Sequence, residues 1–124
     1  MFDKFSLLQR LHELHFPEKE YWAVAGSAMV LHGLRSHTPD IDLGCSTFLA
    51  DKLEQQGCLV SRCEDGTRKI LYSENVEIFE NWIEDKVEII SGVHVVSLCG
   101  LILMKKKLGR EKDLADIELI EKFR

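Results

Sequence analysis

Polar and apolar side chains alternate in residues 40–44, Asp-Ile-Asp-Leu-Gly. This pattern is typical of a β-strand with one buried face, so Ile41 and Leu43 are expected to point into a core. Residues two apart on a strand project from the same face, which brings the carboxylates of Asp40 and Asp42 together on the other side. Such a pair can bind one hard cation that removes its repulsion. An acidic strand face exposed to water explains the same pattern.

A Gly-Ser pair, Gly26-Ser27, follows the apolar segment 21–25 and precedes residues 28–33, which favour a short helix. The missing Cβ of Gly26 and the free N–H groups of a helix start suit the close approach of a phosphate. The hydroxyl of Ser27 adds another donor. A tight turn with a helix cap is the alternative interpretation.

A third carboxylate and a cluster of cations complete the candidate chemistry. Glu77 stands between Val76 and Ile78 in an alternating segment, so it is expected to project from one face while its neighbours pack. Lysine and arginine gather in a chain of net charge −5, at Lys105, Lys106, Lys107, Arg110 and Lys112. This patch can meet a triphosphate, although an exposed helix end that complements the helix dipole gives the same pattern.

The chain has 124 residues, which fits a single domain spanning 1–124. Helices are expected at 3–15, 28–33, 46–56, 98–108 and 112–123, and strands at 21–25, 40–44, 58–63, 68–73 and 76–80. Residues 87–96 favour a further extended segment that Gly92 can break. The expected fold class is α+β, with helices packed on a mixed β-sheet.

Composition excludes several classes of protein. Hydrophobic residues make up 45% and charged residues 30% of the chain, which argues against a disordered protein. The acidic balance weighs against a protein that coats nucleic acid. No apolar run reaches the ~18 residues needed to cross a bilayer, so no membrane partner and a cytoplasmic location are expected. The four cysteines lack a Cys-x-x-Cys spacing, which favours free thiols over a zinc site.

The order and spacing of these motifs resemble the DNA polymerase β-like nucleotidyltransferase superfamily. Its pattern is an apolar strand ending in Gly-Gly or Gly-Ser, about a dozen residues, Asp-x-Asp with apolar neighbours, and a third carboxylate on a later strand. The resemblance implies a minimal nucleotidyltransferase fold. It also implies that Asp40, Asp42 and Glu77 bind Mg²⁺, or Mn²⁺, and act as the catalytic residues. Glu77 replaces the more common Asp of the third position.

Two segments resemble small bacterial and phage nucleotidyltransferase-like proteins of the abortive-infection type. One is residues 25–43, which include Arg35 a few positions before the first Asp, and the other is residues 97–120. The resemblance implies that Gly26, Ser27, Lys105, Arg110 and Lys112 bind the nucleotide, with the cations neutralising the leaving charge. Asp113 and Asp116 are expected to cap a helix and to orient those cations.

The expected function is Mg²⁺-dependent transfer of an NMP from an NTP to an acceptor, with release of pyrophosphate. The acceptor could be a protein, an RNA or a small molecule. Larger members of the superfamily carry a second domain, so a homodimer or a protein partner is expected to complete the site here. The alternatives are a catalytically idle binding module, or a toxin–antitoxin component in phage defence that acts through a partner. Trp22 and Trp82 are interpreted as core or interface residues rather than platforms for base stacking.

Overall fold

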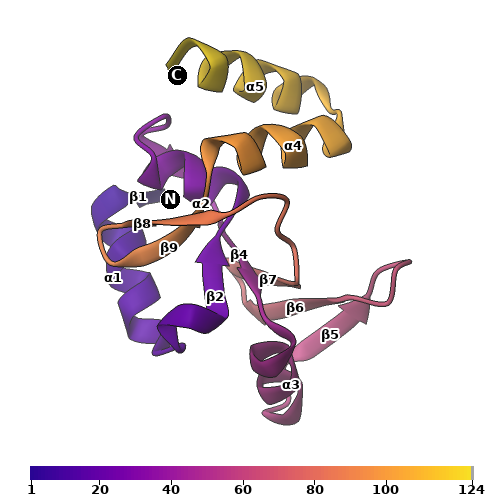
Figure 1. Cartoon of the computed structure of the whole chain (residues 1–124). Coiled ribbons are helices and arrows are strands. Elements are labelled where there is room, and N and C mark those ends of the chain that lie inside the picture. Colours follow the sequence, from indigo (N-terminus) through magenta and orange to yellow (C-terminus); the bar gives the residue numbers. More distant parts are fainter. Residues whose placement is uncertain (124) are drawn as a thin grey trace.

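A computed structural model describes residues 1–123, which form five α-helices around a seven-stranded mixed sheet (Figure 1). The helices are α1 (Lys4–Leu14), α2 (Ala25–Leu31), α3 (Thr47–Gln55), α4 (Leu98–Leu108) and α5 (Glu111–Phe123), with a 3-10 turn η1 at Glu18–Glu20. The strands are β1 (Phe2–Asp3), β2 (Tyr21–Ala23), β3 (His37–Thr38), β4 (Ile41–Cys45), β5 (Leu59–Arg62), β6 (Arg68–Ser73), β7 (Val76–Glu80), β8 (Val87–Ile90) and β9 (Val93–Val96). The α+β fold class is confirmed.

The main sheet has the strand order β5-β6-β7-β4-β2-β9-β8. Strand β4 runs parallel to β7 and β2 runs parallel to β9, while the other neighbouring strands are antiparallel. Strand β4 therefore lies at the centre, where its apolar side chains Ile41 and Leu43 are fully buried. The β4–β7 pairing aligns Asp42 with Glu77 and Gly44 with Phe79, so these four residues share one face of the sheet.

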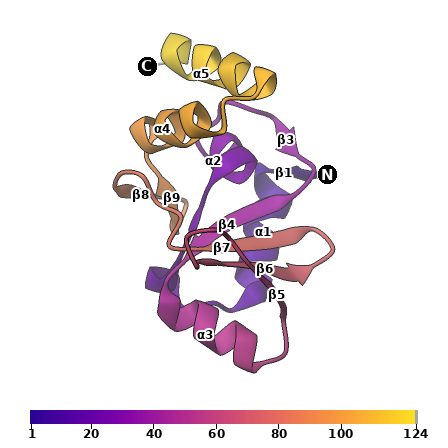
Figure 2. The same ribbon diagram turned by 90° about the vertical axis from the view of Figure 1, so that its right-hand side faces the viewer.

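Helices α3, α4 and α5 lie at the two ends of the molecule. Figures 1 and 2 show α4 and α5 stacked at one end and α3 at the other, beside β5 and β6. Side chains fix where these helices begin: Ser46 accepts a hydrogen bond from the N–H of Leu49, and Ser97 accepts one from the N–H of Gly100. Helix α4 ends at Gly109, whose φ of 63° is in the left-handed region that glycine tolerates best. No helix within residues 1–123 is both long enough and apolar enough to cross a membrane.

Most predicted elements occur within one or two residues of their expected bounds, with strands 68–73 and 76–80 as predicted. One prediction is wrong: Gly26 and Ser27 lie inside the first turn of α2 and not in a turn before it. Ala25, the first residue of α2, has a φ of 52°, which lies in the left-handed region of backbone conformation. The segment 87–96 is a hairpin because Ser91 and Gly92 both have positive φ, which reverses the chain there.

A second, two-stranded sheet lies apart from the main one. Strands β1 and β3, which the sequence did not predict, pair in a separate two-stranded sheet that holds the loop before Asp40. Trp22 and Trp82 are partly buried and pack against the core. None of the four cysteines forms a disulfide.

Candidate functional site

A cavity of about 420 Å³ opens between the centre of the sheet and the helices α4 and α5. Three of its lining residues carry the predicted carboxylates, namely Asp40, Asp42 and Glu77, and four more are the predicted nucleotide contacts Gly26, Lys105, Arg110 and Lys112. Seven of the eight predicted site residues therefore line the same cavity, although they come from four separate parts of the sequence. The eighth, Ser27, does not line it.

The carboxylates form one wall of this cavity. Asp42 and Glu77 lie opposite each other on the parallel strands β4 and β7, and Asp40 lies in the bend just before β4. Burial and then the negative charges of Glu77 and Asp40 raise the pKa of Asp42 to about 6. Burial and the neighbouring carboxylates thus both disfavour the charged form of Asp42.

Lys69 is the cation nearest to that wall, and the sequence pattern alone did not single it out. Its Nζ lies 3.5 Å from Oε2 of Glu77 and 5.8 Å from the centre of the Phe79 ring. Lys69 pairs with Phe79 across β6 and β7, which places it on the same sheet face as Glu77. The sequence placed Lys69 in a strand, but it did not show that this strand lies beside the one that carries Glu77.

The donor set of this wall suits a hard cation, because three carboxylates supply the oxygen ligands that Mg²⁺ prefers. Within residues 1–123, no three histidine, cysteine or acidic side chains already converge at distances that would hold a metal ion. The Glu77 carboxylate lies 3.5 Å from the Lys69 ammonium group. The three carboxylates therefore match Mg²⁺ in the type of ligand they offer, while their present arrangement is not that of a formed metal site.

Two buried hydroxyls fix the backbone that carries the aspartates. The Oγ of Ser27, a fully buried residue, accepts a hydrogen bond of 3.0 Å from the N–H of Asp42. Thr38 donates its hydroxyl to the carbonyl of Asp40 at 3.1 Å. Ser27 was predicted to contact phosphate, but its hydroxyl instead holds the backbone of β4. Gly26 makes room for Thr38, because a Cβ there would lie 2.6 Å from the Thr38 hydroxyl.

Cations from three parts of the chain form the opposite wall. Arg35 donates to both carboxylate oxygens of Asp116, at 2.7 and 2.8 Å, and Lys105 contacts the same carboxylate at 2.9 Å. Asp113, which is 1% exposed, accepts from the side chain of Arg110 at 2.6 Å. The two aspartates thus hold Arg35, Lys105 and Arg110, as expected for residues that orient cations.

The charge of this wall remains positive after these pairings. Two aspartates meet three cations, and Lys112 also lines the cavity without an ion pair to any residue in 1–123. The cavity therefore has an acidic wall on the sheet and a basic wall on the helices. A ligand that carries both a cation and several negative charges matches this arrangement.

Comparisons with known proteins agree with the fold. No protein-family model matches the sequence, and no curated protein matches it. The structure is similar to the crystal structure of the nucleotidyltransferase ANT(2")-Ia in complex with adenylyl-2"-tobramycin, with a TM-score of 0.54 and 18% sequence identity. The similarity covers 92% of this chain and 83% of that one. The chain therefore has a nucleotidyltransferase-like α+β fold.

Proposed function

We propose that this chain is a nucleotidyltransferase that moves an NMP from an NTP to an acceptor hydroxyl and releases pyrophosphate. One observation carries the proposal: the Asp40, Asp42 and Glu77 wall faces the Arg35, Lys105, Arg110 and Lys112 wall across a single cavity. A divalent ion and a triphosphate together would neutralise both walls. The fold shared with ANT(2")-Ia supports the same reaction class.

The acidic wall would hold the metal ion and direct the acceptor. Asp40, Asp42 and Glu77 would bind Mg²⁺ or Mn²⁺, which when bound neutralises charge on the phosphoryl oxygens and helps line up the attacking group. The buried bonds from Ser27 and Thr38 keep the two aspartates at fixed positions on and beside β4. Glu77, at 37% side-chain exposure, is accessible to accept the proton of an incoming hydroxyl.

The basic wall would hold the triphosphate. Lys105 is held in place by Asp113 and Asp116, so its ammonium is fixed before a ligand arrives. Such preorganised positive charge stabilises the negative charge that develops on pyrophosphate as the bond to the α-phosphate breaks. Arg110 and Lys112 are more exposed and can move toward the same oxygens.

Two classes of acceptor are compatible with this reaction. ANT(2")-Ia was solved with an adenylylated tobramycin, so a small hydroxyl-bearing molecule is one acceptor class for this chain. The resemblance to abortive-infection proteins favours a protein acceptor in a toxin–antitoxin pair, with a homodimer or partner completing the site. Both branches use the same donor chemistry in the same cavity.

Intact-mass spectrometry tests the proposal. The chain is incubated with each NTP and Mg²⁺ in the presence of fractions of a bacterial extract, and products are scanned for the added mass of one NMP. We expect transfer with wild type and a loss of more than about a hundredfold in Glu77→Gln, because even residues that only support metal ligands are worth 10–100-fold. Glu88→Gln, an exposed strand carboxylate on β8, is the matched control and should keep full activity. Equal activity of both variants would contradict the proposal.

A further inference from the structure

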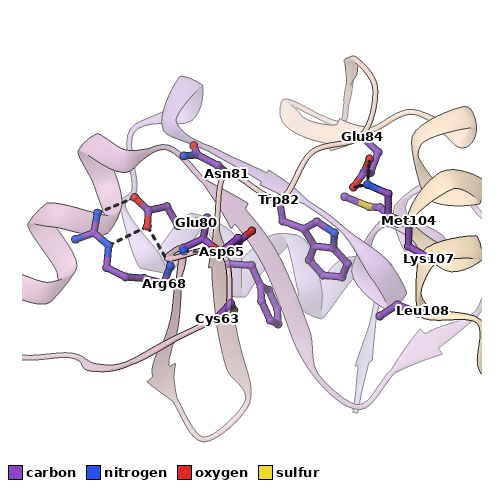
Figure 3. Close-up of a pocket in the computed structure, with 12 residues that line it drawn as sticks. Cys63, Asp65, Arg68, Glu80, Asn81, Trp82, Glu84, Met104, Lys107 and Leu108 are labelled. Atoms are coloured by element: carbon purple, nitrogen blue, oxygen red, sulfur yellow. Dashed lines mark hydrogen bonds and ion pairs between the residues drawn. The ribbon is translucent and has the colours of Figure 1, made fainter.

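A second cavity, of about 390 Å³, adjoins the candidate site. It lies between the end of β7 and helix α4, and three of its side chains, Phe79, Trp82 and Leu108, also line the cavity of the carboxylates. Figure 3 shows the Trp82 indole between the Arg68–Glu80 ion pair on one side and Met104 and Leu108 of α4 on the other. We call this second cavity the Trp82 groove.

The Trp82 groove is apolar at its centre and carries no surplus positive charge. Its two cations are both paired: Arg68 binds Glu80 at 2.7 Å, and Lys107 binds Glu84 at 2.7 Å. Asp65 adds a further carboxylate at its edge. A phosphate would be repelled here, whereas an uncharged flat ring could pack against the aromatic side chains.

The position of Trp82 is fixed by a contact across the sheet. Trp22 lies opposite Gly44 on the neighbouring strand, and its indole fills the space that a Cβ of residue 44 would occupy. The Trp22 Nε1 donates a hydrogen bond of 2.8 Å to the carbonyl of Trp82. Phe79 contacts the Trp82 ring edge to face, with ring centres 4.9 Å apart. The aromatic wall is thus built on the rigid sheet.

The two cavities meet on one sheet face, although the Arg68 and Glu80 side of the Trp82 groove belongs to the opposite face. Asp42 and Glu77 make one row across β4 and β7, and Gly44 and Phe79 make the next row, two residues further along both strands. At about 3.3 Å per residue, the aromatic row lies roughly 7 Å beyond the carboxylates. Helix α4 spans both cavities, with Lys105 at the first and Met104 at the second.

A single ligand with a charged end and a flat uncharged end fits this arrangement. From the shared wall, the paired charges and the row spacing, we infer that the Trp82 groove binds the nucleobase of the NTP, stacked on Trp82, while the triphosphate lies between the carboxylates and the basic wall. This inference rests on the proposed function, because it assigns the remaining part of the same substrate. It makes Trp82 a binding residue for the base of the nucleotide.

Paired titrations with an NTP and with inorganic tripolyphosphate, each with Mg²⁺, test the inference. Stacking of one base on an aromatic side chain is worth ~1–3 kcal/mol, so Trp82→Ala should weaken NTP binding about tenfold or more. Tripolyphosphate has no base, and its affinity should not change. Trp82→Phe should recover part of the NTP affinity, and Ile83→Ala, a matched truncation of an exposed neighbour outside both cavities, should have no effect.

A measurement on the otherwise unaltered chain covers the case in which Trp82→Ala fails to fold. The protein is labelled with 5-fluorotryptophan, and its two ¹⁹F resonances are assigned with Trp22→Phe. The Trp82 resonance should shift with Mg²⁺ and NTP far more than with Mg²⁺ and tripolyphosphate. An equal shift with both ligands, or equal NTP affinity in Trp82→Ala and wild type, overturns the inference while leaving the proposed function intact. If neither ligand binds, the proposed function fails as well.

Discussion

Two groups of charged side chains on β7 face opposite sides of the sheet and differ in how their charge is balanced. Glu80 is 8% exposed and binds the guanidinium of Arg68, which holds its pKa down to about 2. Glu77, three residues earlier, faces the candidate site with Asp42, whose pKa is raised to about 6. We refer to them as the Arg68 cluster and the carboxylate wall.

The difference separates a structural use of charge from a functional one. Arg68 also contacts Asp51 at 2.8 Å and Glu54 at 3.0 Å, so one buried guanidinium links α3 to strands β6 and β7 through direct ion pairs. In the carboxylate wall, Lys69 pairs with Glu77 alone, and burial, followed by the charges of Glu77 and Asp40, raises the pKa of Asp42. A carboxylate with a raised pKa beside a cavity marks a candidate functional site, whereas a buried cation paired directly with carboxylates of a helix and a strand marks a structural link.

The largest expected effect comes from breaking the Arg68 cluster. Arg68→Met leaves Glu80 buried without its partner, and removing one member of a buried ion pair costs about 3–5 kcal/mol. Urea unfolding should show this loss. The double variant Arg68→Met/Glu80→Met removes both charges and should recover most of it. If the double variant is as unstable as the single one, the ion pair is not what links these elements.

Acid should weaken the Arg68 cluster only at a pH below the one at which Asp42 of the carboxylate wall takes up its proton. The pKa of Glu80 is lower in the folded chain than its usual value near 4.5, so its stabilising contribution is full above pH 4.5 and is lost as the pH falls toward about 2. The expected loss is on the order of 2 kcal/mol. Urea unfolding measured at pH 5, 4 and 3 should show a shallower decline for Glu80→Gln than for wild type. If the free energy of unfolding falls equally with pH in Glu80→Gln and wild type, Glu80 is not the source of the acid sensitivity.

The carboxylate wall should respond to pH with the opposite sign. The folded pKa of Asp42 is above its usual value, so its contribution favours folding below about pH 4 and is lost as the pH rises through about 6. In EDTA, Asp42→Asn should therefore be more stable than wild type at pH 8, by on the order of 1 to 2 kcal/mol, and no more stable at pH 4. Glu88→Gln is the control. A less stable Asp42→Asn at pH 8 would show that its charge is compensated after all.

The smallest effect is expected at Lys69. The pair with Glu77 is exposed on both sides, at 43% and 37%, so Lys69→Met should change the free energy of unfolding by less than about 1 kcal/mol. The positive charge of Lys69 lowers the pKa of Asp42, and its loss should raise that pKa further. Carboxyl ¹³C NMR titration measures this directly, with Lys52→Met on α3 as the control. If the pKa of Asp42 stays unchanged in Lys69→Met, Lys69 does not act on the carboxylate wall.

Local patterns in the sequence predicted much of this fold. Alternation in residues 40–44 and 76–80 was enough to place Asp42 and Glu77 on exposed strand faces, because strand periodicity is a short-range property. The cation cluster at residues 105–112 was visible for the same reason. The main charged residues of both walls could therefore be predicted from the sequence.

Contacts between distant segments were beyond that reasoning. The alternation does not say that β4 pairs with β7 in a register that aligns Asp42 with Glu77. Ser27 was assigned to phosphate because its bond to Asp42, fifteen residues away, depends on how α2 packs beside β4. The Trp82 groove depends on the bond from Trp22 to Trp82, which are sixty residues apart. Side-chain roles that arise from packing need the structure.

Calorimetric titration of Mg²⁺ with a non-hydrolysable NTP analogue most directly tests the claim that the carboxylate wall is a metal and nucleotide site. We predict binding to wild type and to Glu88→Gln, and no detectable binding to Asp42→Asn, a variant that should fold at least as well as wild type at pH 8. Unchanged affinity in Asp42→Asn would contradict this claim.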